Sequence, residues 1–200
     1  MKPIKLISIL IVVVILGGAL TVKMLTKYVP IGMTGVRTQE YGIFGKRGII
    51  PRDFGPGWHR NLGPIDTWVL FDSTVQTLTM PVQVQSADGY AVSVDMTTKY
   101  RIMEGMAHKL YQDTGSGVKY KTIVQNEAQR AYLALFGQMK TEDFYNPQQR
   151  REGARKVKAD LAAALEDNFV EVIDILIRDL RFDPQYEKKI QRKKLADQEV

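Results

Sequence analysis

Residues 90–102 read Tyr90-Ala-Val-Ser-Val-Asp-Met-Thr-Thr-Lys-Tyr-Arg-Ile102 and carry the clearest structural signal in this 200-residue chain. Larger, mostly apolar side chains alternate with polar ones along the stretch, as expected of a half-buried β-strand. Asp88-Gly89 precedes it and is typical of a type I′ hairpin turn. Further strands are predicted at Val75 to Val84 and around Trp68 to Asp72. The region from Thr34 to Ile102 is therefore predicted to be β-structure.

After these strands the pattern becomes helical. Apolar residues between Val118 and Phe136 recur at helical spacing. Asn146-Pro147 places an N-cap residue before a proline at the first helical position, which predicts a second helix ending near Asn168. Val170 to Phe182 returns to a strand. Both of its faces are largely apolar, which predicts a central or doubly covered strand. The fold class is α+β, as one domain or as two subdomains.

A run without a charged side chain extends from Leu6 to Val22, with lysines on both sides of it. A bilayer core needs about 20 apolar residues in a helix, and flanking lysines can snorkel to the headgroups. The run therefore predicts a single N-terminal transmembrane helix within residues 1–27. Its representative positions are Leu6, Ile11, Val14, Leu16 and Val22.

Two features of this run bear on targeting and orientation. A cleaved signal peptide is the rival interpretation, but its apolar core is usually only about 7–15 residues long and a small-x-small cleavage site should follow. No clear site of that kind follows the run. The basic residues on its two sides nearly balance, and the short basic N-terminal tail favours a body outside the cytoplasm.

Asp183-Pro184 begins a last predicted helix, over residues 183–200, that is rich in Lys, Arg, Gln, Glu and Ala. Its apolar seam is thin and consists of Tyr186, Ile190, Leu195 and Val200. Such a helix buries little by itself and favours packing against copies of itself, as at the start of a coiled coil. An exposed terminal helix is the alternative. Because no stop signal appears, the natural chain is expected to continue.

The sequence offers few candidates for chemistry. It has no cysteine and only two histidines, and it lacks a zinc helix motif, a phosphate-binding loop and a Gly-x-Ser-x-Gly elbow. His59 is expected in a surface turn and His108 in a packing role. Ser116 and Lys119 have the spacing of a serine–lysine pair, and a membrane-anchored hydrolase using them is one hypothesis. The partner motifs are missing, however, and Ser116 is better explained as a helix N-cap.

No catalytic, cofactor-binding or metal-binding residue is therefore predicted, and the chain is not expected to be an enzyme. The net charge of +6 comes from basic residues interleaved with acids. Nothing resembles a nucleic-acid-binding motif, so nucleic acid is excluded as a partner.

Several segments in order resemble the SPFH (band-7) superfamily, which includes stomatin, prohibitin, flotillin and the bacterial HflK/HflC pair. They are Val29 to Val36, Gly55-Pro-Gly-Trp-His-Arg-Asn-Leu-Gly-Pro-Ile-Asp66, the hairpin from Val84 to Ile102, and Ile175 to Phe182 with the helix after it. The resemblance covers about residues 28–200. It is nearest to the prohibitin-like branch, chiefly through the single anchor and the tail.

The resemblance implies a β-rich SPFH subdomain at 28–102, an α/β subdomain at 103–182 and a coiled-coil entry at 183–200. It also implies a non-catalytic scaffold, without cofactors, that forms a ring or cage on the bacterial inner membrane. Such a scaffold organises a membrane microdomain. Its partners are lipids, copies of the chain or of a paralogue, and membrane proteins such as an AAA protease.

Trp58 and Leu62 are the candidates for a loop that enters the membrane interface, because Trp favours that depth. Ordinary turn and core packing is the alternative for both residues. The second functional hypothesis is an accessory subunit of a single membrane enzyme or channel, without cage formation.

Overall fold

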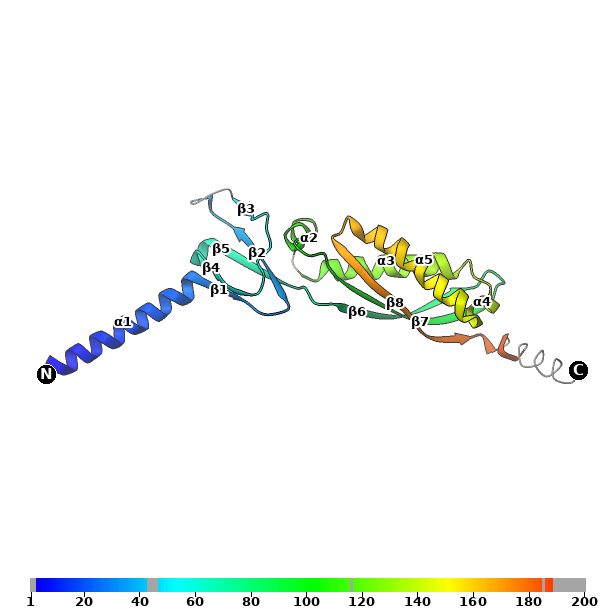
Figure 1. The fold of residues 1–200 in the computed structure, drawn as a ribbon, viewed down its shortest axis with the longest axis horizontal. Coiled ribbons are helices and arrows are strands. Elements are labelled where there is room, and N and C mark those ends of the chain that lie inside the picture. Colours follow the sequence, from blue (N-terminus) through cyan, green and yellow to red (C-terminus); the bar gives the residue numbers. More distant parts are fainter. Residues whose placement is uncertain (1–2, 43–46, 116, 185, 189–200) are drawn as a thin grey trace, which may run out of the picture. The chain divides into compact units, whose positions relative to one another are not determined.

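A computed structural model describes residues 3–42, 47–115, 117–184 and 186–188, with the side chains of the first helix from Leu10 onward. The chain divides into two compact units (Figure 1). Unit 1 contains residues 1–74 and 104–117, and unit 2 contains residues 75–103 and 118–200.

Unit 1 consists of the N-terminal helix, two small antiparallel sheets and one further α-helix. The helix α1 (Pro3–Leu25) passes directly into β1 (Thr26–Val29), which pairs with β4 (Gly57–Arg60). The other sheet has the order β3-β2-β5, with β3 at Gly48–Ile49, β2 at Met33–Gln39 and β5 at Asp66–Asp72. The short helices are η2 (Gly63–Ile65), which leads into β5, and α2 (Ala107–Thr114), which packs on β2.

The predicted membrane anchor is not supported by the described helices. Within the residues that the structure describes, no helix combines the length and the hydropathy needed to cross a bilayer.

Asp53 fastens α2 to the rest of unit 1. Its carboxylate accepts hydrogen bonds from the backbone N–H groups of Ala107 and His108, each 2.8 Å long. The Nδ1 atom of His108 lies 2.8 Å from the same carboxylate. A carboxylate at a helix N-terminus satisfies backbone donors that have no partner within the helix. His108 therefore serves the packing of α2.

Unit 2 is one antiparallel sheet covered by helices on one face (Figure 1). The sheet has the order β6-β7-β8, and the strands are β6 (Gln76–Gln85), β7 (Ala91–Ile102) and β8 (Val170–Phe182). The helices are α3 (Lys119–Phe136), α4 (Thr141–Tyr145) and α5 (Pro147–Glu166). The long strands and helices predicted from the sequence are thus present, with ends that shift by at most a few residues.

The alternation in β7 decides which face of this sheet is covered. Val92, Val94, Met96, Tyr100 and Ile102 are buried, and the residues between them are mostly half-buried. Thr98 lies on the covered face and is fully buried, with its hydroxyl bonded to that of Tyr132 on α3. The strand thus presents one apolar surface to α3 and α5.

Two details of this sheet differ from the sequence predictions. The predicted type I′ turn is wrong, because that turn needs positive φ at both central residues and only Gly89 has one, at 86°. The prediction of a central or doubly covered β8 is also wrong, because β8 is an edge strand with α5 on one face. Its second apolar face includes Leu176, which is 42% exposed.

The division into units also differs from the expected division at residue 103. β7 pairs with β8 along its whole length, from Val92 opposite Phe182 to Ile102 opposite Val170. This ladder ties the β6–β7 hairpin to the C-terminal elements, so the hairpin lies in unit 2 and not with the earlier strands.

An aromatic cluster marks the end of unit 2 where the last helix begins. Tyr186 is 3% exposed, and its ring lies 4.7 Å from that of Tyr90 and 6.1 Å from that of Phe182. Tyr145 stacks on Phe182 at 4.4 Å. The side chain of Tyr186 is thus enclosed within its own chain. The other predicted seam positions, Ile190, Leu195 and Val200, lie outside the described residues.

Candidate membrane interface

An exposed aromatic pair stands immediately after α1. Tyr28 on β1 lies directly opposite Trp58 on β4, and the ring centroids are 5.2 Å apart. Directly opposite residues of antiparallel strands share a face of the sheet. The side chain of Tyr28 is 46% exposed, and that of Trp58 is 71% exposed. The predicted interface residue Trp58 therefore has a second aromatic residue beside it.

The opposite face of the same two strands points into unit 1. The ring of His59 packs against those of Phe54 and Trp68, at 5.4 and 6.0 Å, and its Nε2 atom is 2.6 Å from the carbonyl oxygen of Gly55. Val29 is fully buried. His59 was expected in a surface turn, but it belongs to β4 and packs against aromatic rings because the strand alternates its side chains between two faces.

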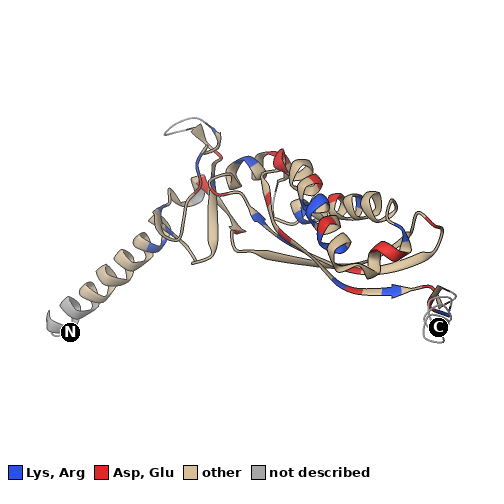
Figure 2. Cartoon of the chain, turned by 45° about the vertical axis from the view of Figure 1, so that its right-hand side comes forward, with Lys and Arg blue, Asp and Glu red and all other residues tan. Residues whose placement is uncertain are grey.

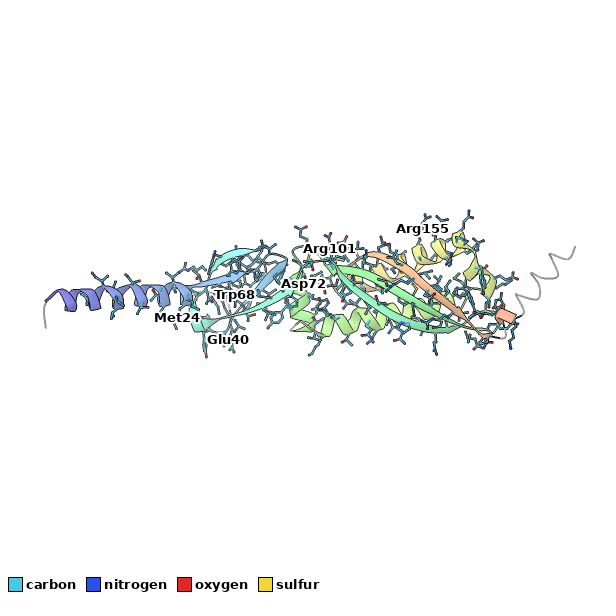
Figure 3. The ribbon with its side chains drawn as sticks, turned by 90° about the horizontal axis from the view of Figure 1, so that it is seen from below. Met24, Glu40, Trp68, Asp72, Arg101 and Arg155 are labelled. Carbon is cyan, nitrogen blue, oxygen red and sulfur yellow. The ribbon has the colours of Figure 1, made fainter. Side chains whose placement is uncertain are left out.

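Asn61 connects this sheet to the end of α1. Its backbone N–H donates to the carbonyl oxygen of Leu25 at 2.8 Å, and its side-chain Nδ2 donates to the carbonyl oxygen of Met24 at 3.0 Å. The side-chain Oδ1 accepts from the Nε1 of Trp68 at 3.1 Å. The last carbonyl groups of a helix need partners from outside the helix. Asn61 supplies two of them, and α1 is thereby fixed to the body of unit 1, with Met24 and Trp68 in the same region (Figure 3).

Basic residues gather at the same end of α1. Lys23 lies in its last turn, Lys27 follows on β1, and Arg60 lies opposite Thr26 on β4. Figure 2 shows basic residues where α1 ends, and no charged residue lies between Leu10 and Val22. Lys and Arg at the end of an apolar helix, with Tyr and Trp beside them, are the residues that favour the headgroup region.

Leu62, the other predicted interface residue, is placed differently. Its side chain is only partly exposed, and its backbone N–H donates to Asp66 Oδ2 at 2.7 Å. The Asp66 carboxylate is fully buried and pairs with Arg37 at 2.8 Å. No ring or hydrogen-bond contact joins Leu62 to Trp58 among the described residues. The backbone of Leu62 is therefore tied to the interior, and the place of its side chain at the membrane interface stays a prediction.

The positions named for the span are apolar and exposed where their side chains are described. Ile11, Val14, Leu16 and Val22 are 52–66% exposed, and the side chain of Leu6 lies outside the described residues. Sequence reasoning missed Tyr28 and Asn61. A tyrosine just after an apolar run is itself an interface signal, whereas the role of Asn61 depends on a pairing that the sequence does not reveal.

The structure gives little basis for chemistry at this surface. Among the residues it describes, no group of three or more His, Asp or Glu side chains is placed to hold a metal ion. Ser116, of the serine–lysine pair, lies outside the described residues, and the N-cap residue of α3 is Val118.

Comparison with known proteins places the chain at the level of a family. No curated protein matches it significantly. The model of the SPFH domain / Band 7 family matches residues 34–200, which include both three-stranded sheets and all of unit 2. The match does not separate the branches of the family, so the prohibitin-like branch stays a prediction. Proteins of this family are membrane-associated, commonly self-assemble and are generally non-catalytic. The chain belongs to the SPFH/band-7 family.

Proposed function

We propose that this protein is a non-catalytic scaffold that is anchored in a membrane by α1 and assembles into a ring or cage. In this function it organises a membrane microdomain and holds or regulates membrane proteins there, for example an AAA protease. The observation that carries the proposal is the junction at Asn61, where an apolar helix is fixed to a sheet that exposes Tyr28 and Trp58.

No described helix combines the length and hydropathy of a span, so attachment through α1 is proposed from the sequence, in which Leu6 to Val22 carry no charged side chain. The helix has 23 residues, which at about 1.5 Å per residue matches a hydrocarbon core about 30 Å thick. The uncharged run begins at Leu6, whereas the side chains of α1 are described only from Leu10 onward. The first four residues of the run therefore enter the argument through the sequence alone. We further propose that the membrane is the bacterial inner membrane and that the body lies outside the cytoplasm, as the short basic N-terminal tail favours.

Assembly is supported by the family and by the composition of residues 183–200. The thin seam of Ile190, Leu195 and Val200 suits a helix that buries its apolar side chains against copies of itself or of a paralogue. The alternative is an accessory subunit that contacts a single membrane enzyme or channel. That alternative needs the same anchor but no self-assembly, so stoichiometry separates the two.

The mass and shape of the full chain, extracted in mild detergent, test this function. Light scattering and electron microscopy should find closed particles of many subunits. An Ile190→Asp and Leu195→Asp double variant should give small particles, because it places charges in the seam. A monomer, or a one-to-one complex with another protein, would remove the cage and favour the accessory subunit.

A further inference from the structure

A groove runs between the first turns of α5 and the outer edge of β8. One part of it, with a volume of about 360 Å³, is lined by Pro147, Arg150, Arg151 and Ala154 on α5 and by Ile175 to Ile177 on β8. A second part, of about 290 Å³, continues past Leu180 to Phe182. The two parts share Arg150 and Ile177, and they combine aliphatic side chains with polar ones that include Asp179, whose carboxylate lies 3.4 Å from Arg181.

The groove carries cationic groups that lack anionic partners. The Nε atom of Arg150 is buried and has no hydrogen-bond partner. Arg178, at the other part of the groove, is exposed, and none of the ion pairs between described residues involves Arg150, Arg151 or Arg178. A buried donor without a partner destabilises the fold by the full cost of its desolvation. An incoming carboxylate would reach the exposed side chains of Arg151 and Arg178.

The position of these arginines near the N-terminus of α5 also favours binding of an anion. Arg150 and Arg151 lie in the first turns of the helix, and Arg155, Lys156 and Lys158 follow further along α5. The positive end of the helix dipole disfavours cations at this position. Glu152 is the acidic residue in this part of the helix, and its carboxylate forms an ion pair with Lys156 at 3.6 Å. The arrangement lowers stability and strengthens the attraction of an anion.

Beside the groove, β8 forms the edge of the sheet, and its register against β7 shifts at Ile173 and at Arg178. β8 is the last strand of the sheet, and both of its faces are apolar around Leu176. Lys158 donates to the carbonyl oxygen of Ile173 at 2.6 Å and so covers the edge before the groove begins. An exposed edge with side-chain pockets is the usual receptor for an extended peptide.

We propose that this groove binds an extended segment of a partner protein in which carboxylate side chains alternate with apolar ones. The carboxylates pair with Arg150, Arg151 and Arg178, and the apolar side chains lie on Ile175, Ile177 and Leu180. The inference deepens the proposed function, because it names the chemistry of a protein that the scaffold holds.

Other occupants fit the groove less well. The opposite edge of the sheet in a second copy would present β6, which has no charged residue from Gln76 to Gln85 and has Pro81 without an N–H group. A membrane is flat on this scale and cannot enter a groove between a helix and a strand. An acidic segment with apolar side chains fits both the aliphatic residues and the unpaired arginines of the groove.

The test uses the full chain in mild detergent and a short fluorescent peptide of alternating glutamate and valine. Its control peptide has glutamine in place of glutamate. Fluorescence anisotropy should detect binding of the first peptide, and Arg150→Gln should weaken it by about tenfold or more, since hydrogen bonds to charged groups are the stronger class. Arg178→Gln, at an exposed position, should weaken it as well without disturbing the fold. The matched control is Arg155→Gln, which removes the same charge from the outer side of α5 (Figure 3) and should leave affinity unchanged.

Equal losses in Arg155→Gln and Arg150→Gln would overturn the proposal, because binding would then reflect net charge alone. Absence of peptide binding would overturn it too. If Arg150→Gln instead lowers particle mass, the groove is an interface between copies. If it instead abolishes binding to anionic lipid vesicles, the groove faces lipid. Particle mass is measured separately, so failure of the groove and failure of the cage are distinguishable.

Discussion

The side-chain amide of Asn61 donates a 3.0 Å hydrogen bond to the carbonyl oxygen of Met24, and a residue of the loop after β4 thereby closes the end of α1. The same side chain accepts from Trp68 on β5. One residue therefore links the helix, the β1–β4 pair and the larger sheet of unit 1.

Asn61→Ala should lower the free energy of unfolding by about 1 kcal/mol, because it removes two side-chain hydrogen bonds near the surface. Thermal unfolding in detergent, followed by tryptophan fluorescence, measures the change. Asn126→Ala is the control, since Asn126 is exposed on α3 and should tolerate alanine. Equal melting temperatures for the two variants would contradict the capping role.

The two tryptophans of the chain should report different depths in a membrane. Trp58 is exposed beside the end of α1, whereas Trp68 packs against Phe54 and His59. In vesicles that contain brominated lipids, the Trp68→Phe variant, which retains Trp58, should be quenched strongly. The Trp58→Phe variant, which retains Trp68, should be quenched little. The reverse order, or no quenching of either, would refute the interface assigned to Trp58.

Thr98 and Tyr132 should be energetically coupled. Their hydroxyl groups are hydrogen-bonded and both side chains are fully buried. Burial raises the pKa of Tyr132, against the opposing effect of the hydrogen bond from Thr98, so the phenol stays neutral at physiological pH. Tyr132→Phe alone leaves a buried hydroxyl without a partner and should cost about 1–2 kcal/mol.

A double-mutant cycle with Thr98→Val tests this coupling. The double variant should be more stable than the sum of the single effects predicts, because no unpaired hydroxyl remains. Urea unfolding of the four proteins gives the coupling energy. Strict additivity would show that the hydrogen bond contributes nothing.

Asp88 should give unit 2 a dependence on acidic pH. Burial alone would raise its pKa, but hydrogen bonds from Thr141 and Ser86 outweigh that effect and hold the pKa below its ordinary value. A lowered folded-state pKa contributes stability above the unfolded-state pKa, near 4, and this contribution is lost as the pH falls through the folded-state pKa.

Asp88→Asn should therefore destabilise the protein at pH 7 by less than about 1 kcal/mol, since Asp88 is exposed and solvent screens its charge. The difference from the wild type should shrink below about pH 4. Melting temperatures between neutral and acidic pH measure it. Asp160→Asn, at an exposed position on α5, should show no such trend. A constant difference across the range would argue against the linkage.

The local parts of the fold could be predicted from the sequence because their signals are local. The alternation of β7 and the Asn146-Pro147 start of α5 each depend on neighbouring residues, and both appear as expected. The side chain of Asn146 accepts from the backbone N–H of Gln148 at 2.9 Å, as an N-cap should.

The remaining features depend on residues far apart in the sequence. The edge position of β8 was missed because an apolar face can also remain exposed, as Leu176 is, so apolar residues alone do not show how many neighbours a strand has. Tyr28 and Trp58 lie on strands that are separated in the sequence by β2 and β3, so no local sequence pattern predicts their pairing. For the same reason Asn61 could not be recognised as the residue that closes α1.

The direct passage from Leu25 at the end of α1 to Thr26 at the start of β1 leaves no hinge between helix and sheet. Asn61 also donates hydrogen bonds to the carbonyl oxygens of Met24 and Leu25 at the end of the helix. A rotation of α1 about its own axis must therefore turn the β1–β4 pair with it. In an assembly of many copies, the azimuth of each helix would set the direction in which its Trp58 points. In the assembly proposed above, the orientation of each α1 would thus be coupled to the orientation of its β1–β4 pair.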